Sequence, residues 1–559
     1  MADNLVPRIY SNFRGVDFRG DEINIMRSPD SLNVWKDYKM TESIRTRPGL
    51  ELLTGFDDPI YGVYFFDGLM LVHSGTSLYR VQEGVKVPLH NKVNAAPSAS
   101  FIYENIWYFK DGVNYLKYDG DTITDVVGYV PTTTIARKPS GGGTKFEDVN
   151  MLSKRRINTF LADGASFDFY LDTTNISPDF KPIVKVDGVL MPEDEVMFDY
   201  PEGKVIFRYK APDAPLTAGQ DNVSVEFEKE VPGYKESIMG CTLLQVFDNR
   251  VFFSGNKDHP NVMWHSSLND PSYVSDLDYY SEGLDEAAIR GLIAGNNALW
   301  VFREPSQANT TIFYHTPTFD DEYGKIYPST HSSITAGCVG RAINFNDDII
   351  FFSGRGMEGI SGDVTTEQVI AHRSTLVDRK MLSEPGYKDM VLGEWEGYLF
   401  VFIGDKAYLA DSRASYHNET HYEYEWFYWD LGKKVNCTCL HNGVLYIGSD
   451  DGVYTLTDMQ ANVESYWVTP KDKFKHPHKL KTTNKRGCVA EATGDISVYA
   501  KLEDTDFELI GTYENVTDYF VSRIKRKKWK DIQLKFHSNT RFSLETVTLE
   551  AWVGGYIKR

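Results

Sequence analysis

The histidine and cysteine residues of this chain are the first candidates for metal chemistry. His476 and His478 stand between lysines, whose positive charge opposes the binding of a cation. Cys437 and Cys439 form a single C-x-C pair, which supplies two ligands where a structural zinc site needs four. The sequence contains no H-E-x-x-H, Walker A, G-x-S-x-G or EF-hand pattern. We therefore predict no bound metal, no cofactor and no catalytic residue.

A run of carboxylates is the remaining candidate for acid–base catalysis. A glycosidase needs two carboxylates at a set separation across a sugar, and sequence spacing cannot show that separation. An acidic loop on an acidic protein is the favoured interpretation, and a carboxylate pair that cleaves a glycosidic bond is the alternative. The residues are Asp270, Asp276, Asp278, Glu282, Asp285 and Glu286.

Two basic segments interrupt a chain whose formal net charge is −20. Residues 471–486 contain seven lysines and arginines, and residues 523–530 contain six. The overall charge disfavours DNA binding by the whole surface, but local basic segments suit an acidic neighbour or a contact with nucleic acid. A solvated strand face is the alternative. The predicted contacts with such a neighbour or with DNA are Lys471, Lys473, Lys475, Arg523, Lys525, Arg526, Lys527, Lys528 and Lys530.

The elements that must carry these groups are short β-hairpins that recur along the chain. Each has an apolar strand, two turn residues such as Asp67-Gly68 or Asn442-Gly443, and a second apolar strand. These turns favour type I′ geometry, in which both central residues need φ above zero. The first apolar residues after the turns are Leu69, Ile106, Val251, Leu299, Ile349, Leu399 and Leu445.

The spacing of these hairpins indicates a β-propeller. The gaps are 37, 145, 48, 50, 50 and 46 residues, and a four-stranded blade occupies about 40 to 50 residues. The gap of 145 residues between Ile106 and Val251 matches the blade length if about 105 of these residues form an insertion. We predict an all-β protein with a β-propeller of about six to seven blades, an inserted β-sandwich and a C-terminal β-domain. Unrelated hairpins in a large β-sandwich are the alternative.

The same pattern divides the chain. Residues 1–131 hold an N-terminal segment and the first blades, and residues 132–236 hold the insertion, which begins with the turn-rich TTTIARKPSGGGTK. The remaining blades occupy 237–463, and 464–559 form the C-terminal domain with the basic segments. No stretch approaches the roughly 20 apolar residues of a membrane span.

Three stretches of the chain resemble phage tail proteins. Residues 13–53 carry a pattern typical of the opening of tail-nozzle proteins, the tubular tail proteins of short-tailed phages, although acidic Glu42 stands where the family usually has glycine. Residues 251–274 and 336–360 are similar to segments of phage tail and connector propellers. The matching positions of the first stretch are Gly15, Val16, Asp17, Ser28, Pro29, Asn33, Arg45, Thr46, Arg47, Pro48 and Gly49.

The resemblance implies a structural virion protein. Such a protein would form a ring, usually of six copies, below the portal and adaptor, and double-stranded DNA would pass through it during genome ejection. It would contact adaptor and other tail proteins, including fibres, after assembly in the host cytoplasm, and its two basic segments would contact an acidic adaptor or DNA. The alternatives are a propeller glycosidase or depolymerase acting on host surface polysaccharide and a receptor-binding tail hub.

The turn Arg45-Thr46-Arg47-Pro48-Gly49 is a predicted latch between blades or subunits. Pro48 fixes its own φ and keeps Arg47 extended. The two guanidinium groups of Arg45 and Arg47 are then available to one neighbouring face.

Overall fold

The computed structural model describes residues 5–20, 23–37, 42–321, 324–361, 369–418, 421–460, 462–525 and 528–556. It forms two compact units, one of residues 1–97 with 332–559 and the other of residues 98–331. None of the described helices is long and apolar enough to cross a membrane. The helical elements are short: α1 (Tyr234–Met239), α2 (Asp378–Met381), η1 (Tyr387–Asp389) and η2 (Asp458–Gln460).

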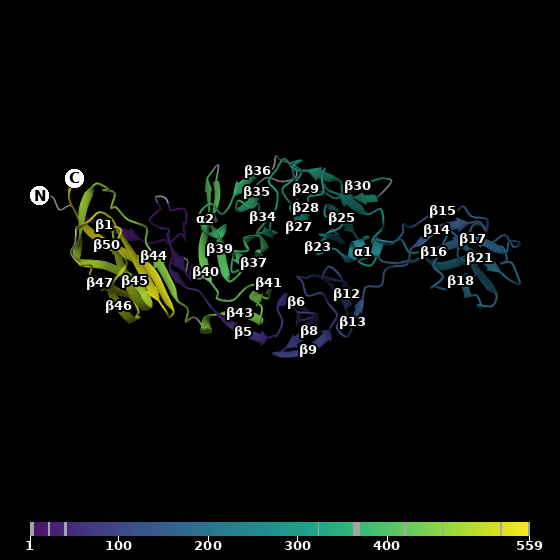
Figure 1. The fold of residues 1–559 in the computed structure, drawn as a ribbon, viewed down its shortest axis with the longest axis horizontal. Helices are drawn as coiled ribbons and strands as arrows, with labels where there is room; N and C mark the ends of the chain where they lie inside the picture. The colour runs from purple at the N-terminus through teal and green to yellow at the C-terminus, as the bar shows by residue number, and fades with distance from the viewer. Residues whose placement is uncertain are drawn as a thin grey trace. The chain divides into compact units, whose positions relative to one another are not determined.

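Seven four-stranded antiparallel sheets among the described residues make the protein a β-propeller, as predicted (Figure 1). The second unit holds three of them: β10 (Ala99–Tyr103), β11 (Ile106–Lys110), β12 (Tyr115–Tyr118) and β13 (Ile123–Asp125); β23 (Leu243–Phe247), β24 (Arg250–Ser254), β25 (Val262–His265) and β26 (Tyr279–Ser281); β27 (Ile289–Gly295), β28 (Ala298–Arg303), β29 (Ile312–His315) and β32 (Ser329–His331). The first unit holds four: β6 (Ile60–Phe66), β7 (Leu69–Ser74), β8 (Ser77–Gln82) and β9 (Val85–His90); β33 (Ala342–Phe345), β34 (Asp348–Phe352), β35 (Met357–Ser361) and β36 (Val369–His372); β37 (Val391–Trp395), β38 (Tyr398–Ile403), β39 (Lys406–Asn418) and β40 (His421–Asp430); β41 (Cys437–His441), β42 (Val444–Gly448), β43 (Gly452–Thr457) and β5 (Gly49–Gly55).

The hairpin turns confirm the sequence pattern at each blade. Every one of the seven predicted marker residues lies in the second strand of a different sheet. Both central residues of every turn have φ above zero, for example 48° at Asp67 and 73° at Gly68, or 50° at Asn442 and 76° at Gly443. Local turn chemistry therefore sets the blade repeat.

The last blade is completed by a strand from the start of the chain. Its first three strands, β41 to β43, are consecutive, but the fourth is β5. The pairing runs from Gly452 opposite Gly55 to Thr457 opposite Gly49. Hydrogen bonds between segments about 400 residues apart thus hold the last blade together.

The inserted segment forms two sheets of its own. Their shared core contains Phe160, Phe169, Val205, Val225 and Phe227. The strands are β14 (Thr132–Arg137), β15 (Thr144–Lys145), β16 (Arg155–Phe160), β18 (Ile183–Val186), β19 (Val189–Leu190) and β22 (Val223–Glu228) in one sheet, and β17 (Asp168–Tyr170), β20 (Val196–Asp199) and β21 (Lys204–Phe207) in the other.

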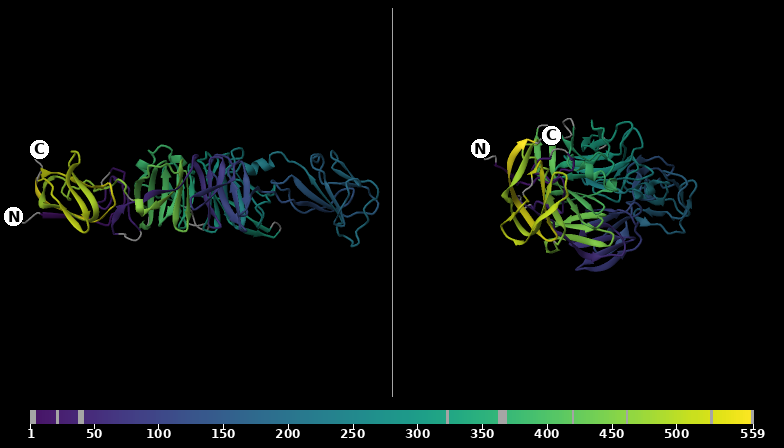
Figure 2. Two further views of the ribbon diagram at one scale, coloured as in Figure 1. Left: turned by 90° about the horizontal axis from the view of Figure 1, so that it is seen from below. Right: turned by 60° about the vertical axis from the view of Figure 1, so that its left-hand side comes forward.

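The C-terminal domain is an eleven-stranded sheet that also takes in the N-terminal strands (Figure 2). β45 (Lys479–Leu502) is central and pairs with five other strands. Four strands from the first 46 residues belong to this sheet, which the hairpin pattern did not indicate. The strands are β1 (Leu5–Tyr10), β2 (Ser31–Leu32), β3 (Val34–Trp35), β4 (Ile44–Thr46), β44 (Ser465–Val468), β45, β46 (Glu508–Val516), β47 (Tyr519–Ser522), β48 (Lys528–Trp529), β49 (Ile532–Ser538) and β50 (Phe542–Tyr556).

One two-stranded ribbon stands outside the blades of the second unit. β30 (Thr318–Asp320) pairs with β31 (Gly324–Ile326), and the ribbon interrupts a blade between β29 and β32. Its base is held by Asp248, which binds Lys325 at 2.6 Å and the hydroxyl of Tyr327 at 2.7 Å.

Candidate functional site

The two basic segments predicted from the sequence lie together in the C-terminal domain. Phe474 and Trp529 are fully buried, with ring centroids 5.3 Å apart in an edge-to-face arrangement. The ammonium group of buried Lys481 donates to the carbonyl oxygens of His476 at 2.5 Å and Lys530 at 2.7 Å. Burial lowers the pKa of Lys481. The aromatic contact, the lysine and the backbone pairing of β45 with β48 thus join segments that are separated by about 40 residues of sequence.

Exposed cations alternate with buried residues along both segments. Lys473 and Lys475 flank buried Phe474, and Lys528 and Lys530 flank buried Trp529. The apolar rings hold the backbone while the charged groups face solvent. Arg526 and Lys527, which were also predicted contacts, lie outside the described residues. We call the exposed set the basic surface: Lys471, Lys473, Lys475, Arg523, Lys525, Lys528 and Lys530.

Most of the basic surface has no ion-pair partner among the residues that the structure describes. Lys471 is paired, 2.9 Å from Asp504 and 3.5 Å from Asp531. Within the described ranges, five other members form no ion pair. Unpaired cations on an acidic protein attract an anionic partner and orient its approach. These five are Lys475, Arg523, Lys525, Lys528 and Lys530.

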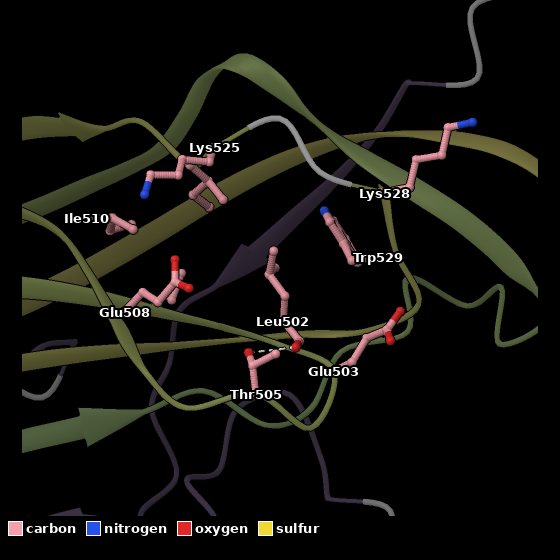
Figure 3. A pocket seen from close by; sticks show the side chains of 10 residues that line it. Leu502, Glu503, Thr505, Glu508, Ile510, Lys525, Lys528 and Trp529 are labelled. Carbon is pink, nitrogen blue, oxygen red and sulfur yellow. Dashed lines mark hydrogen bonds between the residues drawn. The ribbon is translucent and has the colours of Figure 1, made fainter.

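A pocket of about 170 Å³ opens between two of these lysines and β46 (Figure 3). Aliphatic and tryptophan side chains form about half of its lining, and two glutamates, a threonine and two lysines form the rest. Apolar pockets with a few charged groups at the rim are typical of binding sites. The lining residues are Ala500, Leu502, Glu503, Thr505, Glu508, Ile510, Ile524, Lys525, Lys528 and Trp529.

The predicted latch lies where the propeller meets the C-terminal domain. Arg47 is buried between β4, in the C-terminal sheet, and β5, in the last blade. Its guanidinium donates to Oδ1 of Asn33 at 2.9 Å and to the carbonyl oxygens of Pro48 and Asp430 at 2.7 Å each. Burial lowers the pKa of Arg47 to about 10, so the group stays charged at neutral pH.

Arg45 and Gly49 complete this joint. Arg45 forms an ion pair with Asp37 and lies 3.6 Å from Asp458. Gly49 begins the strand that closes the last blade. Within one chain the turn therefore joins two domains, and its role between blades or subunits stays a prediction.

Other residues of the stretch that resembles the nozzle family lie at the same joint. Gly15 has φ of 74°, and a Cβ there would overlap the carbonyl oxygen of Trp426. The amide of Val16 donates to the same oxygen at 2.7 Å. Ser28 is buried and donates to the carbonyl of Val468 at 2.7 Å. The residues that carry the resemblance thus hold the propeller to the C-terminal domain.

The acidic run predicted from the sequence lies within the second unit. Asp276 accepts a hydrogen bond from Tyr234 at 3.0 Å, and Asp278 lies 3.9 Å from the ring of His265. Burial raises the pKa of Asp278 to about 6. Among the described residues, no group of three histidine, cysteine or carboxylate side chains could hold a metal ion.

His372 is held between two carboxylates in a blade of the first unit. Its Nδ1 is 3.1 Å from Glu358 and its Nε2 is 2.6 Å from Asp378. Burial disfavours the charged ring, but the hydrogen bonds to Asp378 and Glu358 outweigh burial and raise the pKa of His372 to about 9. Because the pKa of His372 is higher in the folded state than in the unfolded chain, the protonated ring stabilises the folded state. This stabilisation is fully present at pH values below the ordinary histidine pKa, and it is lost as the pH rises through about 9.

We expect His372→Gln to lower the free energy of unfolding by about 1 kcal/mol at about pH 6 and by clearly less at about pH 10. The loss is modest because the ring is partly exposed and solvent screens its charge. Denaturant unfolding at the two pH values measures the difference. His478→Gln, at an exposed histidine, is the control. An equal loss at both pH values would contradict this assignment.

Sequence reasoning found the cations but missed the pocket and the groups that support it. Leu502 ends β45 and Glu508 begins β46, two ordinary alternating strands, and Glu503 lies in the turn after β45; none of these positions carries a signal of a pocket. Trp529 was the available clue, because a tryptophan among lysines indicates a segment anchored to a core.

No family model matches the chain, and no curated protein matches it. Solved structures similar to it include the computationally designed Ika8 protein, with 11% identity over 73% of this chain and 99% of that chain and a TM-score of 0.34. Virginiamycin B lyase from Staphylococcus aureus is 12% identical over 73% and 98%, with a TM-score of 0.37. BamB from Moraxella catarrhalis is 10% identical over 76% and 93%, with a TM-score of 0.32. Likeness at this level says nothing of function.

Proposed function

We propose that the chain is a structural subunit of the tail of a short-tailed phage, a tubular tail or nozzle protein that forms a ring around the path of the genome. The observation that carries this proposal is the basic surface, where five cations lack a partner among the described residues on a chain of net charge −20. Such a surface is suited to an acidic neighbour such as an adaptor, and it serves docking rather than turnover.

The joint between the propeller and the C-terminal domain supports a structural role for this chain. The positions that resemble the nozzle family include Gly15, Ser28, Asn33 and Arg47, and these bury polar groups that fix two domains to each other. These contacts keep the propeller and the C-terminal domain in a fixed position relative to each other. A subunit of a defined assembly requires such a fixed arrangement of its domains.

The charge of the chain supports passage of DNA rather than its retention. Lysine and arginine bind phosphates by releasing counterions, and a strongly acidic protein lacks that source of affinity over most of its surface. A ring built from one repeated heterologous interface would surround the duplex, and the resemblance implies six copies.

Incorporation into particles tests the proposal. We expect the wild-type protein in purified virions and rings in negative-stain images. We expect the triple variant Lys475→Glu, Arg523→Glu and Lys530→Glu to be incorporated about tenfold less, because it repels an acidic neighbour. Mass spectrometry of particles from complemented infections measures both.

A matched triple reversal at exposed lysines outside the basic surface, Lys138, Lys185 and Lys257, is the control and should be incorporated normally. Absence of the wild-type protein from particles would overturn the proposal. Polysaccharide cleavage that is lost in Asp276→Asn or Asp278→Asn would support the glycosidase instead.

A further inference from the structure

A second pocket, of about 350 Å³, lies within the first unit beside the turn that joins β37 to β38. Two of its side chains are tryptophans: Trp35 of β3 is buried, and Trp395 of β37 is partly exposed. Their ring centroids lie 5.4 Å apart at an interplanar angle of 17°, so the indoles are stacked. The volume falls in the range of roughly 300–1,000 Å³ that is typical of small-molecule sites. The lining residues are Trp35, Asp37, Arg45, Pro48, Trp395, Glu396, Leu456, Thr457 and Asp458.

Two buried hydrogen-bond donors of these residues have no acceptor among the described residues. They are the indole Nε1 of Trp35 and the guanidinium Nε of Arg45. The indole of Trp395, in contrast, donates to the carbonyl oxygen of Gly443 at 3.0 Å. A buried donor without an acceptor is costly, so a ligand that brings acceptor oxygens to these two groups would gain binding energy from them.

Glu396 sets the opposite requirement. Within the described ranges its carboxylate forms no ion pair or hydrogen bond, whereas the carboxylates of Asp37 and Asp458 are both paired with Arg45. Its place is fixed by the two-residue turn, in which Glu396 has φ of 50° and Gly397 has φ of 78°. A ligand that contacts Glu396 should therefore donate a hydrogen bond.

A hydroxyl group meets both requirements, because it accepts and donates hydrogen bonds. A cationic ligand has donors only and would be repelled by Arg45, and an anionic ligand has acceptors only and would be repelled by Glu396. Among hydroxylated molecules, a pyranose also has C–H groups on its ring faces. Such C–H groups pack on the electron-rich face of an indole, which Trp395 provides.

We propose that this pocket binds a neutral saccharide through one pyranose unit, which packs against Trp395, accepts hydrogen bonds from Trp35 and Arg45 and donates one to Glu396. The inference assigns binding only, and no bond of the saccharide is broken. It goes beyond the proposed function and does not rest on it, because the basic surface takes no part in it.

Saturation-transfer NMR with the full chain tests the class of ligand. At about 10 mM ligand, we expect saturation transfer to at least one of methyl glucoside, methyl galactoside, methyl mannoside and N-acetylglucosamine, with a Kd near about 1 mM. Sorbitol is the matched control, since it has the hydroxyl groups without the pyranose ring, and tetramethylammonium chloride tests for a cation site. Transfer to none of the four pyranoses, equal transfer to sorbitol, or transfer to tetramethylammonium instead would overturn the proposal.

Variants of the pocket test its location. Glu396→Asn is expected to weaken binding about tenfold, because asparagine tolerates the positive φ of this turn position but is shorter and uncharged. Glu104→Asn is the matched control in the turn of another blade, where φ is 47°, and should bind as wild type. Trp395→Ala is expected to abolish detectable binding, and thermal unfolding confirms that each variant folds. Equal affinities for Glu396→Asn and Glu104→Asn would exclude this pocket.

The indole N–H signal of Trp35 provides an independent measurement. Comparison with Trp35→Phe assigns this signal, and the pyranose that binds is expected to shift it more than the signals of the other tryptophans, because the N–H gains an acceptor. An unmoved signal at saturating pyranose would refute the contact. Absence of the chain from particles would overturn the proposed function and leave this site standing, whereas a chain found in particles that fails these binding tests would do the reverse.

Discussion

Arg47→Ala is expected to lower the free energy of unfolding by about 3–5 kcal/mol, among the largest effects of any single change in this chain. The substitution removes a buried charged donor from three acceptors, Oδ1 of Asn33 and the carbonyl oxygens of Pro48 and Asp430. Each acceptor is then left without this donor in a place that water reaches poorly. Buried groups without partners cost more than the lost bond itself.

The effect should be specific to the guanidinium fork of Arg47. Arg47→Lys keeps the charge but cannot reach three diverging acceptors, so it should recover little of the stability. Arg541→Ala is the control, since its side chain is 45% exposed and contacts Asp458 at 3.2 Å; it should cost less than about 1 kcal/mol. Denaturant unfolding followed by tryptophan fluorescence compares the three. A loss for Arg47→Ala as small as that for Arg541→Ala would contradict the role of this joint.

The blade repeat could be predicted because its cause is local. Each turn needs only two adjacent residues able to adopt positive φ, such as Glu396 and Gly397 at 50° and 78°. The alternating apolar strands on either side follow directly in the sequence. Neither feature depends on what lies elsewhere in the chain.

The joint could not be predicted because its pairings are distant. Gly49 pairs with Thr457, and Arg45 pairs with Ser543. The sequence around Arg47 does not indicate that its hydrogen-bond partners are Asn33 and the carbonyl oxygen of Asp430. The resemblance marked these positions as special without showing what they touch.

The basic surface could be predicted only in part from the sequence. The lysines were visible as charge, but their convergence depends on the contact of Phe474 with Trp529 across 55 residues. The pocket depends on the same contact, because Trp529 forms one of its walls. One buried ring therefore supports both the docking surface and the pocket.

That dependence makes Trp529→Ala the second large prediction. Trp529 is fully buried, and its indole Nε1 donates to Thr483 at 3.1 Å. Removing the ring leaves a cavity against Phe474 and an unpaired hydroxyl, with an expected loss of about 3–5 kcal/mol in the C-terminal domain. Hydrogen exchange should also show lost protection over residues 474–482, since the two basic segments are no longer clamped together.

The matched control is Trp552→Ala in the same domain, where the ring is 38% exposed. It removes the same side chain from a partly exposed position and should cost clearly less than Trp529→Ala. Protection in the inserted domain, residues 132–236, should be unchanged in both variants because that domain has its own core. If Trp529→Ala unfolds like Trp552→Ala and keeps protection over 474–482, then the backbone pairing of β45 with β48 and the hydrogen bonds of Lys481 hold the segments together without the ring. The basic surface would then be set by hydrogen bonds rather than by aromatic packing.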